Sequence, residues 1–268
     1  MRVNKNIAIS ASKILLVPYD AHHVDQYHQW MQNESLREAT ASDLLTLEEE
    51  YENQQSWRTA HDKLTFIVCQ PSAMSGNHAD ADGMIRAGED DAPLRMVGDV
   101  NLFLTPLDCD DEDGDGDGNG GVNGATEQKD ETRYVKGEID IMIAAPGHRR
   151  KGLGEAAVRA LLRFLARNHD SIMEEYIGAT GIKTAKIKRL VAKIHADNAG
   201  SIRLFENLGF RQDGDPDYFN EISTVLGFPP SSPTAGVGDE GTESGGVDSE
   251  ADVLGYRECF YDRSRLDK

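Results

Sequence analysis

Residues 137–168 read GEIDIMIAAPGHRRKGLGEAAVRALLRFLARN, and this stretch decides the fold class. Its first part alternates isoleucines with other residues, which is typical of a strand with one buried face. Its last part repeats apolar side chains at helical spacing. Between them lies a short basic turn that contains two glycines. The order strand, glycine-containing turn and helix predicts a helix N-terminus that can receive a phosphate group.

The turn itself, HRRKGLG at 148–154, suits a diphosphate. Arg149, Arg150 and Lys151 supply positive charge, while Gly152 and Gly154 let a ligand approach the backbone because they carry no Cβ. The segment GLGEAA also satisfies the dinucleotide pattern G-x-G-x-x-A, but a basic turn with a proline separates it from the strand. A P-loop is excluded because no G-K-[ST] follows.

Three segments, 71–93, 108–131 and 229–251, are poor in aromatic and β-branched residues. They cannot bury enough apolar surface to offset the entropy of ordering, so we expect disordered acidic insertions. The expected organisation is one domain at 1–228, interrupted at about 71–93 and 108–131. An acidic linker and C-terminal tail are expected at 229–268.

The net charge of −19 belongs mostly to these segments, which carry −4, −9 and −5. About −1 remains for the rest, so no nucleic-acid partner is expected. Three widely spaced cysteines argue against a disulfide framework or a zinc site. The acidic run at 111–116 begins like a calcium loop but lacks the glutamate at the twelfth position, so no metal is expected. No apolar run is long enough for a membrane helix, which predicts a soluble cytoplasmic protein, or a nuclear one.

The remaining patterns predict strands at 13–18, 64–69, 95–105, 137–145, 190–196 and 218–228. Helices are expected after Asp20, at the capping box formed by Thr46 and Glu49, after Gly152 and after Asn198. The order is β-α-α-β-β-β-α-β-α-β. It predicts an α/β fold with a mixed, mostly antiparallel sheet flanked by helices.

Two motifs resemble the GNAT superfamily of N-acetyltransferases. RRKGLG at 149–154 matches the signature [QR]-x-x-G-x-[GA], and NAGSIRLFENLGF at 198–210 is similar to N-x-x-S-x-x-[LF]-[YF]-x-x-x-G-F. Further stretches, among them LVPY, TASDLLTLEEEY, VGDVNLFL and GEIDIMIA, resemble the N-acetyltransferase 9-like family. The resemblance covers residues 1–228 outside the insertions.

The resemblance implies a GNAT fold with acetyl-CoA bound in a V-shaped opening between strands 137–145 and 190–196. Strand backbone would hold the pantetheine arm, the turn would hold the pyrophosphate, and the 198–210 segment would meet the far side of CoA. The implied contact residues are Ile141, Met142, Ile143, Ala144, Arg149, Arg150, Lys151, Gly152, Leu153, Gly154, Asn198, Ser201 and Phe205. Many relatives have a tyrosine, proposed to protonate the leaving thiolate, where this chain has Phe205.

Two acidic residues are candidates for the base that takes the amine proton. Glu138 lies on the strand that would carry the thioester, and superfamily members often use a glutamate there. Asp99, with Asn101, is the second candidate. Either could also be an ordinary polar residue on a strand. The resemblance implies an acetyl-CoA-dependent N-acetyltransferase that acts on a primary amine, a protein N-terminus or a lysine, in a ternary complex. The alternatives are an inactive CoA-binding regulatory protein and an acidic interaction protein.

Overall fold

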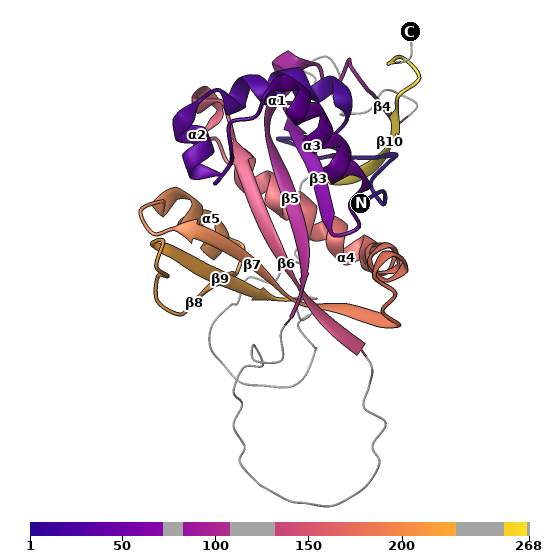
Figure 1. Ribbon diagram of the computed structural model, residues 1–268. Coiled ribbons are helices and arrows are strands. Elements are labelled where there is room, and N and C mark those ends of the chain that lie inside the picture. Colours follow the sequence, from indigo (N-terminus) through magenta and orange to yellow (C-terminus); the bar gives the residue numbers. More distant parts are fainter. Residues whose placement is uncertain (72–82, 108–131, 229–254, 267–268) are drawn as a thin grey trace, which may run out of the picture.

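One mixed sheet of ten strands organises the chain, in the order β4-β10-β1-β2-β3-β5-β6-β7-β9-β8. The computed structural model describes residues 1–71, 83–107, 132–228 and 255–266 (Figure 1). The strands are β1 Ile7–Ser10, β2 Leu15–Pro18, β3 Lys63–Cys69, β4 Met84–Arg86, β5 Met96–Pro106, β6 Thr132–Ile143, β7 Thr184–His195, β8 Arg211–Asp213, β9 Glu221–Gly227 and β10 Arg257–Asp262. Only β4–β10 and β6–β7 pair in parallel among these strands, so the predicted mixed, mostly antiparallel sheet is confirmed.

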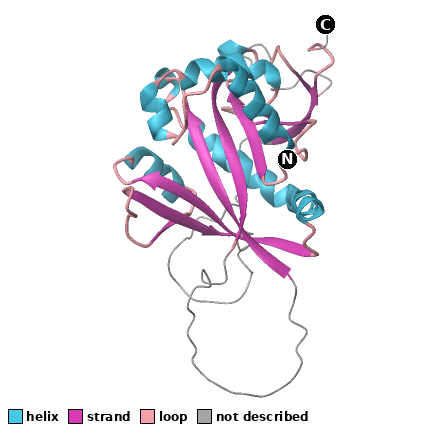
Figure 2. Cartoon of the chain, viewed as in Figure 1, coloured by secondary structure: helices cyan, strands magenta, loops and turns pink. Residues whose placement is uncertain are grey.

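Helices cover both faces of this sheet (Figure 2). They are α1 Val24–Met31, α2 Glu34–Ala39, α3 Leu47–Thr59, α4 Leu153–Thr180 and α5 Ala199–Asn207. The helices α1 and α3 pack together over β3 and β5, whereas α4 packs on the opposite face against β5, β6 and β7. None of the helices in the described residues combines the length and the apolar character that a bilayer crossing requires.

The alternation of β6 places its two sets of side chains as predicted. Ile139, Ile141 and Ile143 belong to the core that includes the apolar face of α4. Met142, on the other face, packs with Met31 from α1 instead. Because side chains alternate along a strand, Glu138 and Asp140 share the face of Met142. This sheet face therefore carries both acidic side chains of β6.

The helix α4 is longer than the sequence indicates. Its apolar stripe was expected to end near Asn168, whose backbone leaves the helical region at φ −113°. The Asn168 side-chain amide donates to the carbonyl of Phe164 at 3.1 Å, and the helix resumes. It continues because Ile172, Met173 and Tyr176 extend the buried stripe. Gly181, with φ 72°, ends it in the left-handed conformation that glycine adopts most easily.

Two expected boundaries are wrong. Residues 83–93 were assigned to an insertion, yet they contain β4 and place Asp91 fully inside the protein. Residues 255–266 were assigned to a tail, yet β10 pairs with β1 and with β4. These short segments gain order by pairing with a strand from a distant part of the chain. The expected insertion at 108–131, with its calcium-like run, lies outside the described residues, as do 72–82 and 229–254.

Asp91 joins these two segments to the N-terminal half of the chain. Its carboxylate accepts hydrogen bonds from the hydroxyl of Tyr261 on β10, from Nε2 of His23 at 2.9 Å and from the Gly88 N–H at 2.6 Å. His22 Nε2 lies 3.1 Å from the same carboxylate. Although burial alone would raise the pKa of Asp91, the hydrogen bonds to His22 and His23 and the charges of these histidines hold that pKa well below its usual value.

Removing one donor from this carboxylate should destabilise the fold. We expect Tyr261→Phe to lower the free energy of unfolding by about 1–3 kcal/mol, the usual effect of leaving a buried charged acceptor short of a partner. Urea unfolding followed by circular dichroism measures this change. Tyr218→Phe is the matched control, because the Tyr218 side chain is 96% exposed. Equal stability of the two variants would mean that β10 is not held through Asp91.

Candidate active site

The strands β6 and β7 separate halfway along their length. Their parallel pairing runs from Thr132 opposite Thr184 to Glu138 opposite Val191. Beyond that point β6 continues to Ile143 beside β5, and β7 continues to His195 beside β9. Figure 1 shows the two strands diverging above their shared lower half. The V-shaped opening expected between 137–145 and 190–196 is therefore present.

The β6 backbone offers hydrogen-bonding groups to this opening. The Leu107 N–H donates to the Tyr134 carbonyl at 3.0 Å and the Ala144 N–H to the Val97 carbonyl at 2.9 Å, and the register between β5 and β6 is unbroken. In an antiparallel pair, alternate residues bond to the partner strand. The backbone N–H and C=O groups of the even-numbered residues of β6 therefore bond to β5. Those of the odd-numbered Ile141 point away from β5, into the opening. An extended amide chain can pair with such groups as an added strand does.

The basic turn is fixed to the end of β6 by Arg149. Its guanidinium donates to the carbonyls of Ile143 at 2.9 Å and Ala144 at 3.2 Å, and its N–H donates to the Pro146 carbonyl at 3.2 Å. Arg149 was expected among the cofactor contacts, and two of its guanidinium nitrogens, Nε and Nη2, bond within the turn. Arg150 and Gly152 adopt left-handed backbone conformations, with φ of 59° and 73°. These two residues turn the chain into α4.

The start of α4 leaves several backbone donors without a helical partner. The first intrahelical hydrogen bond is from the Ala156 N–H to the Gly152 carbonyl, at 3.1 Å. The N–H groups of Leu153 and Gly154 precede it, so they belong to the group that a helix leaves unpaired. Lys151 is exposed beside them. This helix N-terminus with its adjacent cations can hold a diphosphate.

A cation that the sequence did not indicate also lies at this turn. A Cβ on Gly152 would stand 3.3 Å from Nζ of Lys13, which comes from the exposed turn between β1 and β2. Gly154 also has a packing role. A Cβ at Gly154 would lie 3.1 Å from Leu204 and 3.6 Å from Ile141, so this glycine allows α4, α5 and β6 to pack closely.

Of the residues expected on the far side of the opening, Asn198 is exposed whereas Phe205 is buried. Asn198 caps α5 by accepting the Ser201 N–H at 3.1 Å, and it remains exposed. Phe205 is 2% exposed, and its ring packs edge-on against Phe210 with the ring centres 5.0 Å apart. The structure therefore does not bring Phe205 to the surface of the opening. Leu204, the preceding residue, lies against the turn instead.

Asp99 is the most unusual carboxylate on the sheet face near the opening. It lies opposite Met142 in the β5–β6 pairing and is only 2% exposed. Its Oδ2 accepts hydrogen bonds from Asn101 Nδ2 at 2.8 Å and from the Tyr27 hydroxyl at 3.4 Å. Its Oδ1 has no partner in the described structure. Burial is the main cause that raises the pKa of Asp99 to about 7.

Asp140 lies on the same face, directly opposite Asn101 and diagonally across the strand pair from Asp99. Partial burial of the Asp140 carboxylate raises its pKa, and the charge of Glu138 raises that pKa further. We expect the shift to be smaller than at Asp99, because Asp140 remains exposed to water. Glu138 is half-buried beside it. Of the two candidate bases, Asp99 has the buried position, the unpartnered oxygen and a pKa near neutrality, so the geometry favours Asp99 over Glu138.

One group in the described part of the chain has side chains close enough to share a metal ion: His22, His23 and Asp91. The hydrogen bonds do not fit such a site. Nδ1 of His23 accepts the Asp20 N–H at 3.0 Å, so the proton of the neutral ring must lie on Nε2. That Nε2–H donates to Asp91 and leaves no lone pair for a metal. The group is a hydrogen-bonded structural link far along the sheet from the opening.

Comparison with known proteins agrees with this architecture. Residues 13–211 match the family described as the acetyltransferase (GNAT) domain, and the chain belongs to this family. It is 36% identical over 227 residues to the N-acetyltransferase 9-like protein of Schizosaccharomyces pombe, which covers 84% of this chain and 98% of the relative. It is also 36% identical over 227 residues to the alpha/beta-tubulin-N-acetyltransferase 9 of Homo sapiens, covering 84% and 86%. The family and these relatives make the chain an N-acetyltransferase.

Among solved structures, the spermidine N-acetyltransferase of Vibrio cholerae in complex with CoA and spermine is similar. Its TM-score is 0.49 at 12% identity, over 80% of this chain and 95% of that chain.

Proposed function

We propose that this protein transfers the acetyl group of acetyl-CoA to a primary amine of a protein, directly within a ternary complex. The observation that carries the proposal is the position of Asp99. This buried carboxylate on β5 has a free oxygen and lies across from Met142 of β6. The residue before Met142, Ile141, points its backbone groups toward β7. A proton acceptor thus stands beside the place where a thioester arm can pair.

The cofactor would be held by the groups described above. Ile141 would pair with the pantetheine amides, and the helix start at Leu153 and Gly154 would receive the pyrophosphate. Arg150, Lys151 and Lys13 would supply positive charge, while Arg149 keeps the turn in place through its bonds to the end of β6. Asn198 and Ser201 would border the other side of the opening.

The reaction then needs one proton acceptor. The amine nitrogen attacks the acetyl carbonyl carbon, a C–N bond forms, and the C–S bond of the thioester breaks as thiolate leaves. The proton of the amine passes to Asp99, directly or through a water. The thiolate of CoA is an adequate leaving group, so the absence of a tyrosine at Phe205 does not prevent the transfer.

The acceptor is proposed from the relatives, whose printed names include alpha/beta-tubulin-N-acetyltransferase. Tubulin is therefore the first acceptor to test. We expect the protein to transfer labelled acetyl from acetyl-CoA to tubulin, and mass spectrometry of the product locates it on an N-terminal or a lysine amine. Binding of acetyl-CoA by calorimetry without transfer to tubulin or to a library of free N-terminal peptides would favour the inactive regulatory protein instead.

A further inference from the structure

The sheet face that carries Asp99 changes the sign of its charge along its length. Asp99 lies across from Met142 on β6, and Asp140 and Glu138 follow further down that strand on the same face, because side chains alternate along a strand. We call Asp99, Asp140 and Glu138 the acidic half of this face. The next residue of β6 on the same face is a cation, Lys136.

The neighbouring strand β7 adds further cations beside Lys136. Arg189 pairs with Lys136, and Lys186 pairs with Tyr134 of β6. Their neighbours in β7, among them Ile187, pack in the core with α4, so Lys186 and Arg189 point to the face of Lys136. The strand β7 has four lysine or arginine residues and no acidic residue. Lys136 and Lys186 form no ion pair with another described residue.

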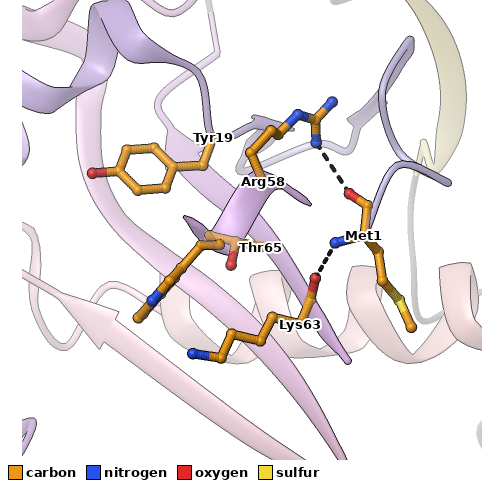
Figure 3. Close-up of a pocket in the computed structure, with 6 residues that line it drawn as sticks. Met1, Tyr19, Arg58, Lys63 and Thr65 are labelled. Atoms are coloured by element: carbon orange, nitrogen blue, oxygen red, sulfur yellow. Dashed lines mark hydrogen bonds between the residues drawn. The ribbon is translucent and has the colours of Figure 1, made fainter. Parts of the chain in front are cut away.

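Lys63 on β3 adds a cation from the other side. It pairs with Phe103 of β5, which in turn pairs with Glu138. Its carbonyl accepts a hydrogen bond from the nitrogen of Met1 at a small pocket, and its side chain extends away from Met1 (Figure 3). Its Nζ lies over the rings of Trp57 and Phe103, 5.2 Å and 5.8 Å from their centres. We call the four cations the basic half of the face: Lys63, Lys136, Lys186 and Arg189.

Helices cover the upper end of this face and leave its lower end exposed. At the upper end, Met142 packs with Met31 of α1 and Leu36 of α2. Figure 1 shows α1, α2 and α3 over the upper part of the sheet, and the lower ends of β6 and β7 extend beyond them. Tyr134 at the lower end is 47% exposed. A polypeptide whose amine reaches Asp99 can therefore continue along the basic half.

The pairing of the strands sets where such a polypeptide would meet positive charge. Lys63 pairs with Phe103, four residues along β5 from Asp99, and Lys136 pairs with Thr105, six residues from Asp99. At about 3.4 Å per residue, these separations are about 14 Å and 20 Å. An extended acceptor spans them with about four to six residues. Acidic side chains at that spacing would face the basic half, whereas acidic side chains next to the amine would face the acidic half.

We propose that the basic half binds an acidic stretch of the acceptor protein, which begins about four residues from the acetylated amine. The acidic half attracts the ammonium form of the amine and repels acidic side chains next to it, while the basic half attracts those further along. The two halves together orient the acceptor on the sheet. This inference names the acceptor class of the proposed acetyl transfer and rests on that function.

Three synthetic peptides test the orientation. Each begins with lysine, which offers an α-amine and a side-chain amine. The first has glutamates from the fifth to the eighth position, the second has the same glutamates from the second to the fifth position, and the third has glutamines from the fifth to the eighth. We expect kcat/KM for the first peptide to exceed that for the other two by about 10-fold, as for a few exposed ion pairs. Added salt should reduce this advantage.

The variant Lys136→Gln with Lys186→Gln removes two charges and keeps long polar side chains. We expect the kcat/KM ratio between the first and second peptides to fall from about 10-fold to about 2-fold or less. The matched control is Arg2→Gln with Lys5→Gln, which removes two exposed cations before β1 and should keep the wild-type ratio. Unchanged thermal midpoints of unfolding would show that both variants are folded.

The outcomes separate this inference from the proposed function. If the wild-type protein acetylates the first and second peptides equally well, acetyl transfer stands and the docking of an acidic stretch is wrong. A wild-type ratio in the variant of Lys136 and Lys186 would overturn the inference in the same way. If the wild-type protein binds acetyl-CoA but acetylates neither the peptides nor tubulin, both proposals are wrong.

Two other occupants of the basic half would give their own results. If the preference for the first peptide appears only after residues 109–130 are deleted, the acidic segment of this chain occupies the basic half. If single-stranded RNA of equal charge displaces the labelled first peptide at lower concentration than an acetylated copy of that peptide, the surface is a nucleic-acid site. Fluorescence anisotropy measures the displacement, and either result would overturn the inference.

Discussion

Asp99→Asn should lower kcat by about 10²–10⁴-fold, the usual range for loss of a general base. The amide has nearly the shape of the carboxylate and can keep the contact with Tyr27, but it cannot take a proton. Affinity for acetyl-CoA should change little, because the groups that would hold CoA are backbone N–H and C=O groups and the cations of the basic turn. Steady-state kinetics with saturating acetyl-CoA, together with calorimetry of CoA binding, measures the two quantities separately.

The pH dependence gives this variant a second signature. Asp99 acts in its ionised form, and its pKa of about 7 means that kcat/KM should rise with pH through about 7 in the wild type. That limb should be absent from the profile of Asp99→Asn. Glu138→Gln, a substitution on the neighbouring strand, is the rival test and should keep the limb. A profile that loses the limb in Glu138→Gln and keeps it in Asp99→Asn would return the role of base to Glu138.

A measurement of stability checks that Asp99→Asn is folded. The raised pKa of Asp99 predicts the direction in which the substitution changes the free energy of unfolding. A carboxyl group whose pKa is higher in the folded state than in the unfolded state stabilises the fold only while it is protonated. That contribution is lost as the pH rises through about 7. The free energy of unfolding of the variant, taken relative to that of the wild type, should therefore increase by about 2 kcal/mol from pH 5 to pH 8. Urea unfolding at the two pH values measures this difference.

The sequence predicts well what is local. The alternation of 137–143, the basic turn and the apolar stripe of α4 lie within one continuous stretch, so periodicity alone places them. The capping box of Thr46 and Glu49 is present as expected, with the Thr46 N–H donating to Glu49 at 2.8 Å. The separation of β6 from β7 is also confirmed, but only the resemblance to GNAT proteins pointed to it, because pairing between distant strands leaves no local pattern.

What the sequence could not predict depends on contacts between distant segments. Tyr261 and Asp91 are 170 residues apart, and both lie in or beside stretches rich in small and charged residues, so composition assigns them to insertions and tail. Glu50 stands in a run of glutamates and resembles a solvated helix face until α3 is seen to turn it inward. Lys13 approaches Gly152 only because the turn between β1 and β2 lies beside the basic turn.

Gly154→Glu should weaken acetyl-CoA binding by at least about 100-fold, or about 3 kcal/mol. The structure gives two reasons. The new side chain would begin 3.1 Å from Leu204 and 3.6 Å from Ile141, so the start of α4 would have to move away from β6 and α5. The carboxylate would also place negative charge where the helix N-terminus should receive a diphosphate. Calorimetry with acetyl-CoA measures the affinity.

Gly178→Glu controls for the added charge, since it makes the same substitution in the same helix at an exposed position with nothing within 4 Å. Lys151→Glu separates charge from packing, because Lys151 is exposed and its replacement displaces no neighbour. It should weaken binding less than Gly154→Glu, by about 10-fold, and the loss should shrink as salt screens the charges. If folded Gly154→Glu and Lys151→Glu both bind acetyl-CoA as tightly as Gly178→Glu, the diphosphate does not lie at this helix N-terminus. A loss in Gly154→Glu alone would assign the effect to packing between α4 and β6 and would leave the positive charges of the turn without a role in binding.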